Sequence, residues 1–85
     1  MSNTLPKTFT ASDFLRALER AVELEPGSIQ GTEALTDLEW WDSLAALTFM
    51  AVADQELQVI VSGDQLVNCH SVPDLLGLLG DRISR

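Results

Sequence analysis

Residues 42–57 read DSLAALTFMAVADQEL, a short polar start followed by a long apolar run. Aspartate is a good helix cap, because its carboxylate accepts a hydrogen bond from a free N–H group of the first turn. With Asp42 as the cap, this stretch predicts a helix from Ser43 to Leu57. Apolar residues cover more than half of its circumference, which is typical of a helix packed against several neighbours. They are Leu44, Leu47, Phe49, Met50, Val52 and Leu57.

A first helix is predicted before this one. Thr10 and Asp13 have the spacing of a capping box, and the helix they open should run to Leu24, just before Pro26 and Gly27. The apolar residues fall at three- and four-residue spacings, which predicts one buried face and one polar face. The buried face should comprise Phe14, Leu15, Leu18, Ala21 and Val22, and the polar face Arg16, Glu19, Arg20 and Glu23.

A final helix is predicted after the central one. Ser71 and Asp74 form another capping-box pattern, and Gly80 is placed to end this helix. Its inward residues should be Val72, Leu75, Leu76, Leu78 and Leu79. Between the two helices, residues 60–63 should form a linker, followed by a short helical turn over residues 64–67.

Residues 25–41 form a long connection between the first and second helices, and Ile29, Leu35 and Leu38 should anchor it to the core. The expected fold is all-α, a small bundle of three main helices plus one short helical turn. Residues 1–9 should be a short N-terminal tail, and residues 10–85 the single domain. A chain of 85 residues leaves little room for an enclosed active site.

Composition excludes several classes of function. Thirteen acidic and five basic residues give a net charge of -8, so nucleic acid and anionic membranes would repel the surface. We expect neither as a partner. No apolar segment reaches the roughly 18 residues of a membrane span, and the N-terminus lacks the pattern of a signal peptide. The single cysteine, Cys69, fits a reducing compartment, so we expect a cytoplasmic location.

Ser43 is the strongest candidate for chemistry. A serine just inside a helix N-terminus is well placed to carry a phosphate, because the first N–H groups lack partners and the helix dipole is positive there. The alternative is a serine at an ordinary helix start, in an unmodified helical module that binds other proteins. The tripeptide Asp42-Ser43-Leu44 does not separate these readings by itself, whereas its place after a long anchored loop favours the modified serine.

The chain resembles the acyl carrier proteins from about residue 10 to residue 84. The resemblance rests on FLRAL at 14–18, the spacer ending in DL at 37–38, DSL at 42–44, the helix that follows, VIV at 59–61, and SVPDLL at 71–76. It implies that Ser43 bears a covalent 4′-phosphopantetheine arm derived from coenzyme A, with Asp42 as the cap beside it. It also implies that Leu44 and Leu47 contribute to partner docking. We expect the docking surface to be the patch around Trp41, Ser43, Leu44 and Leu47, extended by the turn near residues 64–67.

The same resemblance implies a carrier and not an enzyme. Its partners would be a phosphopantetheinyl transferase, a ligase that loads acyl or aminoacyl groups, and acyltransferase or synthase enzymes. We expect a monomer. Peptidyl and aryl carriers share the arm, so the sequence leaves the class of cargo open. Glu39-Trp40-Trp41 precedes the serine where relatives commonly carry glycine and a small residue, and the start of the helix is uncharged. The uncharged start departs from many fatty-acid carriers, and the Trp-Asp-Ser-Leu variant is similar to dedicated carriers of specialised pathways.

The remaining candidate functional residues are better explained by structural or surface roles. Cys69 and His70 lack the further ligands that zinc needs, so we expect a semi-buried thiol and a surface imidazole. One of the two indoles should cap the core, with Trp41 beside the helix start, and the other should lie on the surface. The acidic pairs Glu23/Glu25 and Asp37/Glu39 should be solvated surface charges, because acid–base catalysis needs a pocket.

Overall fold

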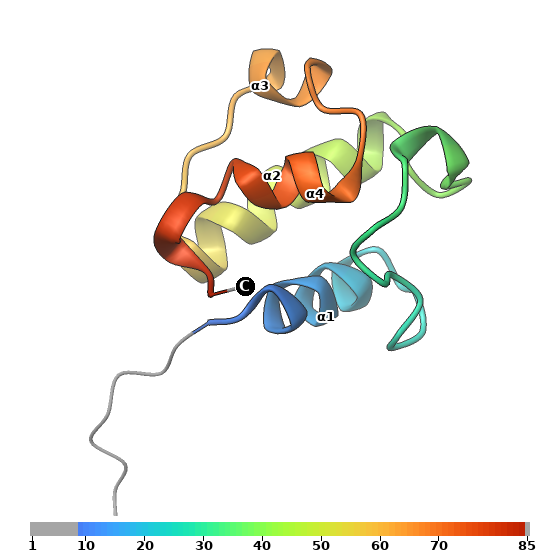
Figure 1. The fold of residues 1–85 in the computed structure, drawn as a ribbon, viewed down its shortest axis with the longest axis horizontal. Coiled ribbons are helices and arrows are strands. Elements are labelled where there is room, and N and C mark those ends of the chain that lie inside the picture. The colour runs from blue at the N-terminus through green and yellow to red at the C-terminus, as the bar shows by residue number, and fades with distance from the viewer. Residues whose placement is uncertain (1–8, 85) are drawn as a thin grey trace, which may run out of the picture.

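The computed structural model describes residues 9–84, and this part of the chain is all-helical as predicted. Its elements are α1 (Ala11–Ala21), the 3-10 helix η1 (Leu35–Asp37), α2 (Ser43–Leu57), α3 (Gly63–Val67), α4 (Val72–Gly77) and the 3-10 helix η2 (Gly80–Arg82). In Figure 1, α2 passes behind α4, with α1 below them and α3 above. Among the described residues, no helix is long and apolar enough to cross a membrane.

The core gathers around two phenylalanines. Phe14 of α1 and Phe49 of α2 are fully buried, and their rings meet edge-to-face with centroids 5.4 Å apart. Leucine, isoleucine, valine and alanine side chains from the four α-helices, the long loop and the connecting segments close around them; among these are Leu18, Ile29, Leu35, Val52, Ala53, Val61, Leu66, Val72, Leu75, Leu79 and Ile83. The predicted anchors of the loop are therefore confirmed for Ile29 and Leu35, and Leu38 packs half-buried against the same core.

The first helix ends three residues earlier than predicted. Glu23 adopts a left-handed conformation, with φ of 65°, and its N–H donates to Arg20 O at 3.2 Å. The N–H of Leu24 donates to Glu19 O at 2.8 Å, which completes a Schellman motif and stops the helix at Ala21. Ala21 is consequently exposed, not part of the buried face, and Ala17 is buried in its place.

The final helix is also shorter than predicted. The Ser71 hydroxyl caps α4 by accepting from the Asp74 N–H, but the Asp74 carboxylate accepts from the His70 N–H at 2.9 Å. In the expected capping box the Asp74 carboxylate would accept from the N–H of Ser71, the cap residue. It accepts instead from the N–H of the residue before the cap. α4 ends at Gly77, after which i→i+3 hydrogen bonds tighten the chain, and Gly80, with φ of 62°, begins η2 instead of ending the helix.

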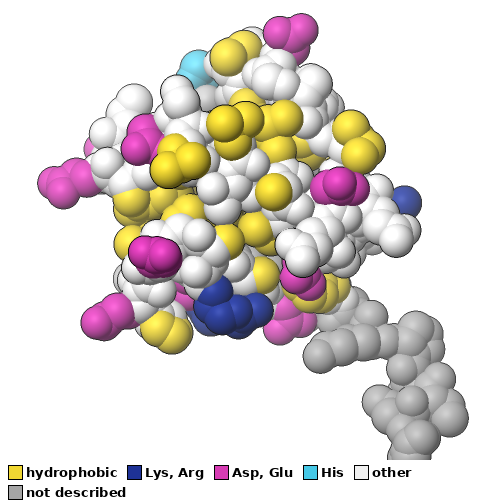
Figure 2. All heavy atoms as spheres, turned by 180° about the vertical axis from the view of Figure 1, so that it is seen from behind, with side chains coloured by type: hydrophobic (Ala, Val, Ile, Leu, Met, Phe, Trp, Pro, Cys, Tyr) yellow, Lys and Arg dark blue, Asp and Glu magenta, His cyan; other side chains and the backbone are white. Residues whose placement is uncertain are grey.

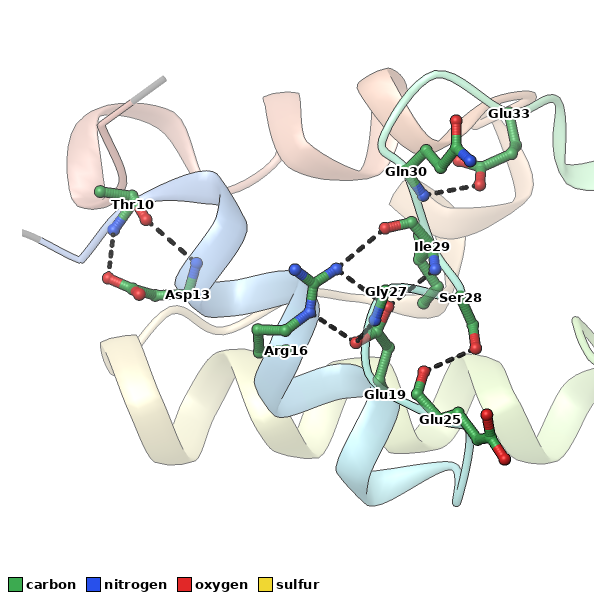
Figure 3. Close-up of polar contacts among 10 residues, drawn as sticks. All are labelled: Thr10, Asp13, Arg16, Glu19, Glu25, Gly27, Ser28, Ile29, Gln30 and Glu33. Atoms are coloured by element: carbon green, nitrogen blue, oxygen red, sulfur yellow. Dashed lines mark hydrogen bonds and ion pairs between the residues drawn. The ribbon is translucent and has the colours of Figure 1, made fainter.

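Glu19 lies in the core, and its predicted place on the polar face is wrong. Its side chain is 1% exposed and accepts from Arg16 Nε at 2.5 Å and Arg16 Nη2 at 2.9 Å. The same carboxylate accepts from the Gly27 N–H at 3.0 Å and the Ile29 N–H at 2.7 Å (Figure 3). The carboxylate tolerates burial because these four N–H donors replace the hydrogen bonds to water that it loses. One side chain of α1 thus fixes the start of the long loop.

The rest of the long loop is tied to α4. The Leu35 N–H donates to His70 O at 2.9 Å, and the Val72 N–H donates to Glu33 O at 2.8 Å, forming an isolated antiparallel bridge. The Glu33 carboxylate also accepts from the N–H groups of Gln30, Gly31 and Thr32. The loop is therefore held at both ends before it reaches α2.

The described ends of the chain meet beside α1. The Ala11 N–H donates to Ser84 O and the Ser84 N–H donates to Phe9 O, each at 2.9 Å. Phe9 is half-buried against the core, so it belongs to the domain and not to the predicted tail. The remaining tail prediction, for residues 1–8, lies outside the described residues.

Replacing the Glu19 carboxylate should destabilise the fold. Glu19→Gln removes a charge that pairs with Arg16 and accepts from two backbone N–H groups, so we expect the free energy of unfolding to fall by about 2 kcal/mol. Urea denaturation followed by circular dichroism measures this. Glu56→Gln, at an exposed position of α2, is the control and should change stability by less than about 0.5 kcal/mol. Equal losses for both variants would contradict the structural role of Glu19.

The stability provided by Glu19 should depend on pH. Burial pushes the pKa of Glu19 up, but hydrogen bonds from Arg16, Ile29 and Gly27 outweigh it and hold the pKa below its ordinary 4.5. A lowered folded-state pKa contributes stability above about pH 4.5 and loses it as the pH falls through the folded value. The stability difference between wild type and Glu19→Gln should therefore be constant near neutral pH and shrink as the solution is acidified below 4.5. A difference that grows on acidification would refute this assignment.

Candidate functional site at the start of α2

Ser43 is the first residue of α2, as predicted, and it is exposed. Asp42 precedes it in an extended conformation, and its Oδ1 accepts from the Ala45 N–H at 2.8 Å. The aspartate side chain is thereby engaged as the helix cap. Within residues 9–84, neither the Ser43 hydroxyl nor the N–H groups of Ser43 and Leu44 have a hydrogen-bond partner. The site offers an accessible hydroxyl beside free donors at the positive end of a helix.

The approach to the helix is set by the residues just before it. The Trp41 N–H donates to Leu38 O at 3.2 Å, and the Trp41 ring lies edge-on to Phe49, with centroids 6.5 Å apart. The Trp40 and Trp41 rings are also edge-to-face, at 5.8 Å. Both indoles are half-buried against the core, so the expectation that one of them lies on the surface is wrong. This aromatic series connects the serine to the centre of the fold.

Two grooves lie on either side of the serine. The groove on the α1 side has a volume of about 400 Å³, and its lining includes Val22, Trp40 and Leu44. The groove on the α3 side has a volume of about 340 Å³, and Ser43 itself lines it with Trp41, Ala46, Leu66, Val67 and Cys69. Each indole therefore borders one groove, and the serine lies at the rim between them.

Apolar side chains surround the serine on the surface. Leu44 is 72% exposed and Leu47 is 61% exposed, although both sit on a helix whose other side is in the core. α2 therefore leaves this side open to solvent, and the contribution of Leu44 and Leu47 to partner docking stays a prediction. Val67, at the end of α3, is 75% exposed. These residues are large and apolar, and exposing several together is unusual for a small domain.

The remaining candidates behave as predicted. Cys69 is half-buried, and His70, both members of the Glu23/Glu25 pair and both members of the Asp37/Glu39 pair are exposed. Burial, together with the nearby charge of Asp74, raises the pKa of the Cys69 thiol, which keeps it protonated and poorly nucleophilic. In the described part of the chain, no three histidine, cysteine or acidic side chains are gathered so as to hold a metal ion.

Comparison with known families identifies this arrangement. The family model described as phosphopantetheine attachment site matches residues 12–79, which is most of the chain. The chain belongs to the phosphopantetheine-attachment-site family. It is therefore a phosphopantetheine-bearing carrier protein, and its cofactor is covalently attached 4′-phosphopantetheine. No curated protein and no solved structure matches it. Carrier domains of this family generally interact with a phosphopantetheinyl transferase and with biosynthetic enzymes, and are generally not catalysts themselves.

The start of α2 fits such an arm. A phosphate ester on Ser43 would lie beside the free N–H groups of Ser43 and Leu44, at the positive end of the helix dipole. The grooves next to Ser43 leave room for a flexible chain on either side. Sequence reasoning placed Ser43 and its Asp42 cap at the start of this helix, where the structure has them, and expected the turn at residues 64–67 to extend the docking surface. It missed the burial of Glu19, for which an isolated sequence pattern gives no signal.

The Asp42 cap should stabilise the helix that carries the serine. Asp42→Ala removes the acceptor for the Ala45 N–H and should lower the free energy of unfolding by about 1 kcal/mol. Asp42→Asn keeps an acceptor of the same size and should cost less than half as much. Thermal or urea denaturation of the two variants measures the difference. An equal loss in both would show that the negative charge, and not the hydrogen bond, stabilises this terminus.

Proposed function

We propose that Ser43 is the residue that carries the arm and that the protein transports acyl intermediates as thioesters in a specialised biosynthetic pathway. The single observation that supports this assignment is the exposed, unbonded Ser43 hydroxyl at the capped start of α2, within the matched region. The described residues contain other exposed serines, but Ser43 combines that exposure with free N–H donors and an adjoining groove. Asp42 contributes by holding the helix end that presents the hydroxyl.

Attachment requires a phosphopantetheinyl transferase and coenzyme A. The Ser43 oxygen forms a phosphodiester bond, losing its proton, while the adenosine bisphosphate portion of coenzyme A leaves. The terminal thiol of the bound arm then supplies a thioester linkage that is activated toward nucleophiles. The protein's own residues do not perform that later chemistry; they present the arm to a loading ligase and to acyltransferase or synthase enzymes. A flexible arm raises the effective concentration of its cargo at each partner.

The uncharged start of α2 supports a dedicated carrier for one pathway. From Ser43 to Ala53 the helix carries no charged side chain. We propose that the protein acts as a monomer in the cytoplasm, because copies with a net charge of -8 repel one another and the single cysteine suits a reducing compartment. Acyl, aminoacyl and aryl cargo are distinguished by incubating the arm-bearing protein with ligases of each class and measuring which one loads it.

Ser43→Ala should abolish arm attachment without disturbing the fold. The chain is incubated with coenzyme A and a promiscuous phosphopantetheinyl transferase, and its intact mass is measured before and after. Wild type should gain one phosphopantetheinyl unit, and Ser43→Ala should gain none. Ser12→Ala is a matched control, because Ser12 is an exposed serine in the first turn of α1, which is also capped. This control should accept the arm as wild type does.

The results separate the alternatives clearly. Attachment to Ser43→Ala would show that another hydroxyl carries the arm. No gain by folded wild type with several transferases, including one from the producing organism, would favour an unmodified helical module that binds other proteins. Circular dichroism on each variant shows that the chain is folded in every case.

A further inference from the structure

The groove that Ser43 lines on the α3 side adjoins a further groove. This further groove has a volume of about 350 Å³ and lies between η1 and the connection from α3 to α4; its lining is Leu35, Thr36, Leu38, Trp41, Cys69 and His70. Trp41 and Cys69 also line the groove of about 340 Å³ that contains Ser43. The two grooves therefore meet at Trp41 and Cys69, and together they are called the indole track.

The walls of the indole track are held by contacts within the fold. At its far part, the Leu35 N–H donates to His70 O at 2.9 Å, which joins η1 to the connection before α4. Where the two grooves meet, the Trp41 N–H donates to Leu38 O at 3.2 Å, and the Trp41 ring lies edge-on to Phe49. The track is thus formed before any group enters it, so that binding there costs little ordering of the protein.

The lining of the track changes character along its course. Next to the serine it presents the apolar side chains of Ala46 and Val67. Beyond the Trp41 ring it presents the Thr36 hydroxyl and the His70 imidazole, both on exposed residues. A 4′-phosphopantetheine arm has the same order of groups, because a carbon with two methyl groups follows the phosphate, and two amides and the thiol come after it. Apolar walls with a few polar groups are typical of sites that bind small molecules.

Charge favours the track over the groove on the α1 side. The α1-side groove is lined by two carboxylates, those of Glu23 and Asp42. Among the described residues that line the track, the one acidic residue is Asp42, whose carboxylate is used as the helix cap. An anionic phosphodiester is therefore repelled less on the side of the track. On the face seen in Figure 2, hydrophobic side chains gather across the middle of the molecule and most acidic ones lie nearer its margin, so the surface also offers apolar contact to the uncharged rest of an arm.

We propose that the indole track binds the protein's own 4′-phosphopantetheine arm, with the phosphate at Ser43, the methyl groups against Trp41 and the thiol end beside His70. This inference rests on the proposed function, because it requires attachment at Ser43. The arm is then held against the domain between its visits to partner enzymes. Burial and the charge of Asp74 raise the pKa of the Cys69 thiol, so this neighbouring thiol stays protonated and does not take the cargo from the arm.

The test locates the arm by nuclear Overhauser effects. The protein is labelled with heavy carbon and nitrogen isotopes, and a promiscuous phosphopantetheinyl transferase attaches the arm from unlabelled coenzyme A, so that contacts between arm and protein are recorded selectively. The methyl protons of the arm should show contacts to the Trp41 ring, and the protons next to its thiol should show contacts to the His70 ring. The chain has one histidine, and Trp40→Phe removes the signals of the other indole, so both assignments are unambiguous.

Two matched variants place a larger side chain in one groove each. Thr36→Phe fills the far part of the indole track and should abolish the contacts to His70, although the arm is still attached. Thr48→Phe fills the α1-side groove and should leave these contacts as in the wild type. Intact mass shows that each variant carries the arm, and circular dichroism shows that each is folded.

The contrary outcomes separate this inference from the proposed function. Contacts of the arm with Trp40 or Val22 would place it in the α1-side groove, and an attached arm without contacts to the protein would be free in solution. Either result, or contacts to His70 that persist in Thr36→Phe, overturns the role of the indole track while the carrier function stands. If folded wild type accepts no arm at all, the proposed attachment at Ser43 fails together with it.

Discussion

The buried carboxylate of Glu19 is the constraint on which the placement of the site depends. Few charged side chains are found fully inside a small domain, because desolvation is costly unless every acceptor site is used. Here Arg16 comes from the preceding turn of α1, and the N–H groups of Gly27 and Ile29 come from the loop that follows the helix. The carboxylate therefore joins α1 to a segment that has no regular structure of its own, and Ile29 is carried into the core with it.

From that anchor the loop leads to the serine through a series of fixed points. The bridge between Ala34 and Ser71 ties the loop to the start of α4, and the contact between the Trp41 and Phe49 rings ties its end to the core. Asp42 then caps α2. The serine that follows is thus presented by a rigid scaffold although it stands at the end of a long loop. This arrangement is expected where a flexible arm provides the motion and the protein holds the attachment point in place.

The sequence predicted those parts of the fold that depend on neighbours a few residues apart. The bounds of α2, the Thr10 and Ser71 caps and the short helix near residues 64–67 are all set by local patterns, and the structure agrees with them. The errors fall where distant groups decide. A carboxylate on the predicted polar side of α1 is buried because two N–H groups eight and ten residues later bind it. Helical periodicity alone would group Leu44 and Leu47 with the core residues of α2, and it was the resemblance that placed them in partner docking; no element of the described chain covers either of them. Their exposure is a property of what the fold leaves open, which no helical pattern encodes.

The central claim is that Ser43 carries the arm, and one measurement on the protein isolated from the cells that produce it tests this most directly. Cleavage after glutamate releases residues 40–56, a peptide in which Ser43 is the single serine, and fragmentation by mass spectrometry locates any added group. Our account predicts one phosphopantetheinyl unit on Ser43 in this peptide. An arm located on any other residue, or a fully unmodified peptide from cells shown to modify other carriers, would contradict it.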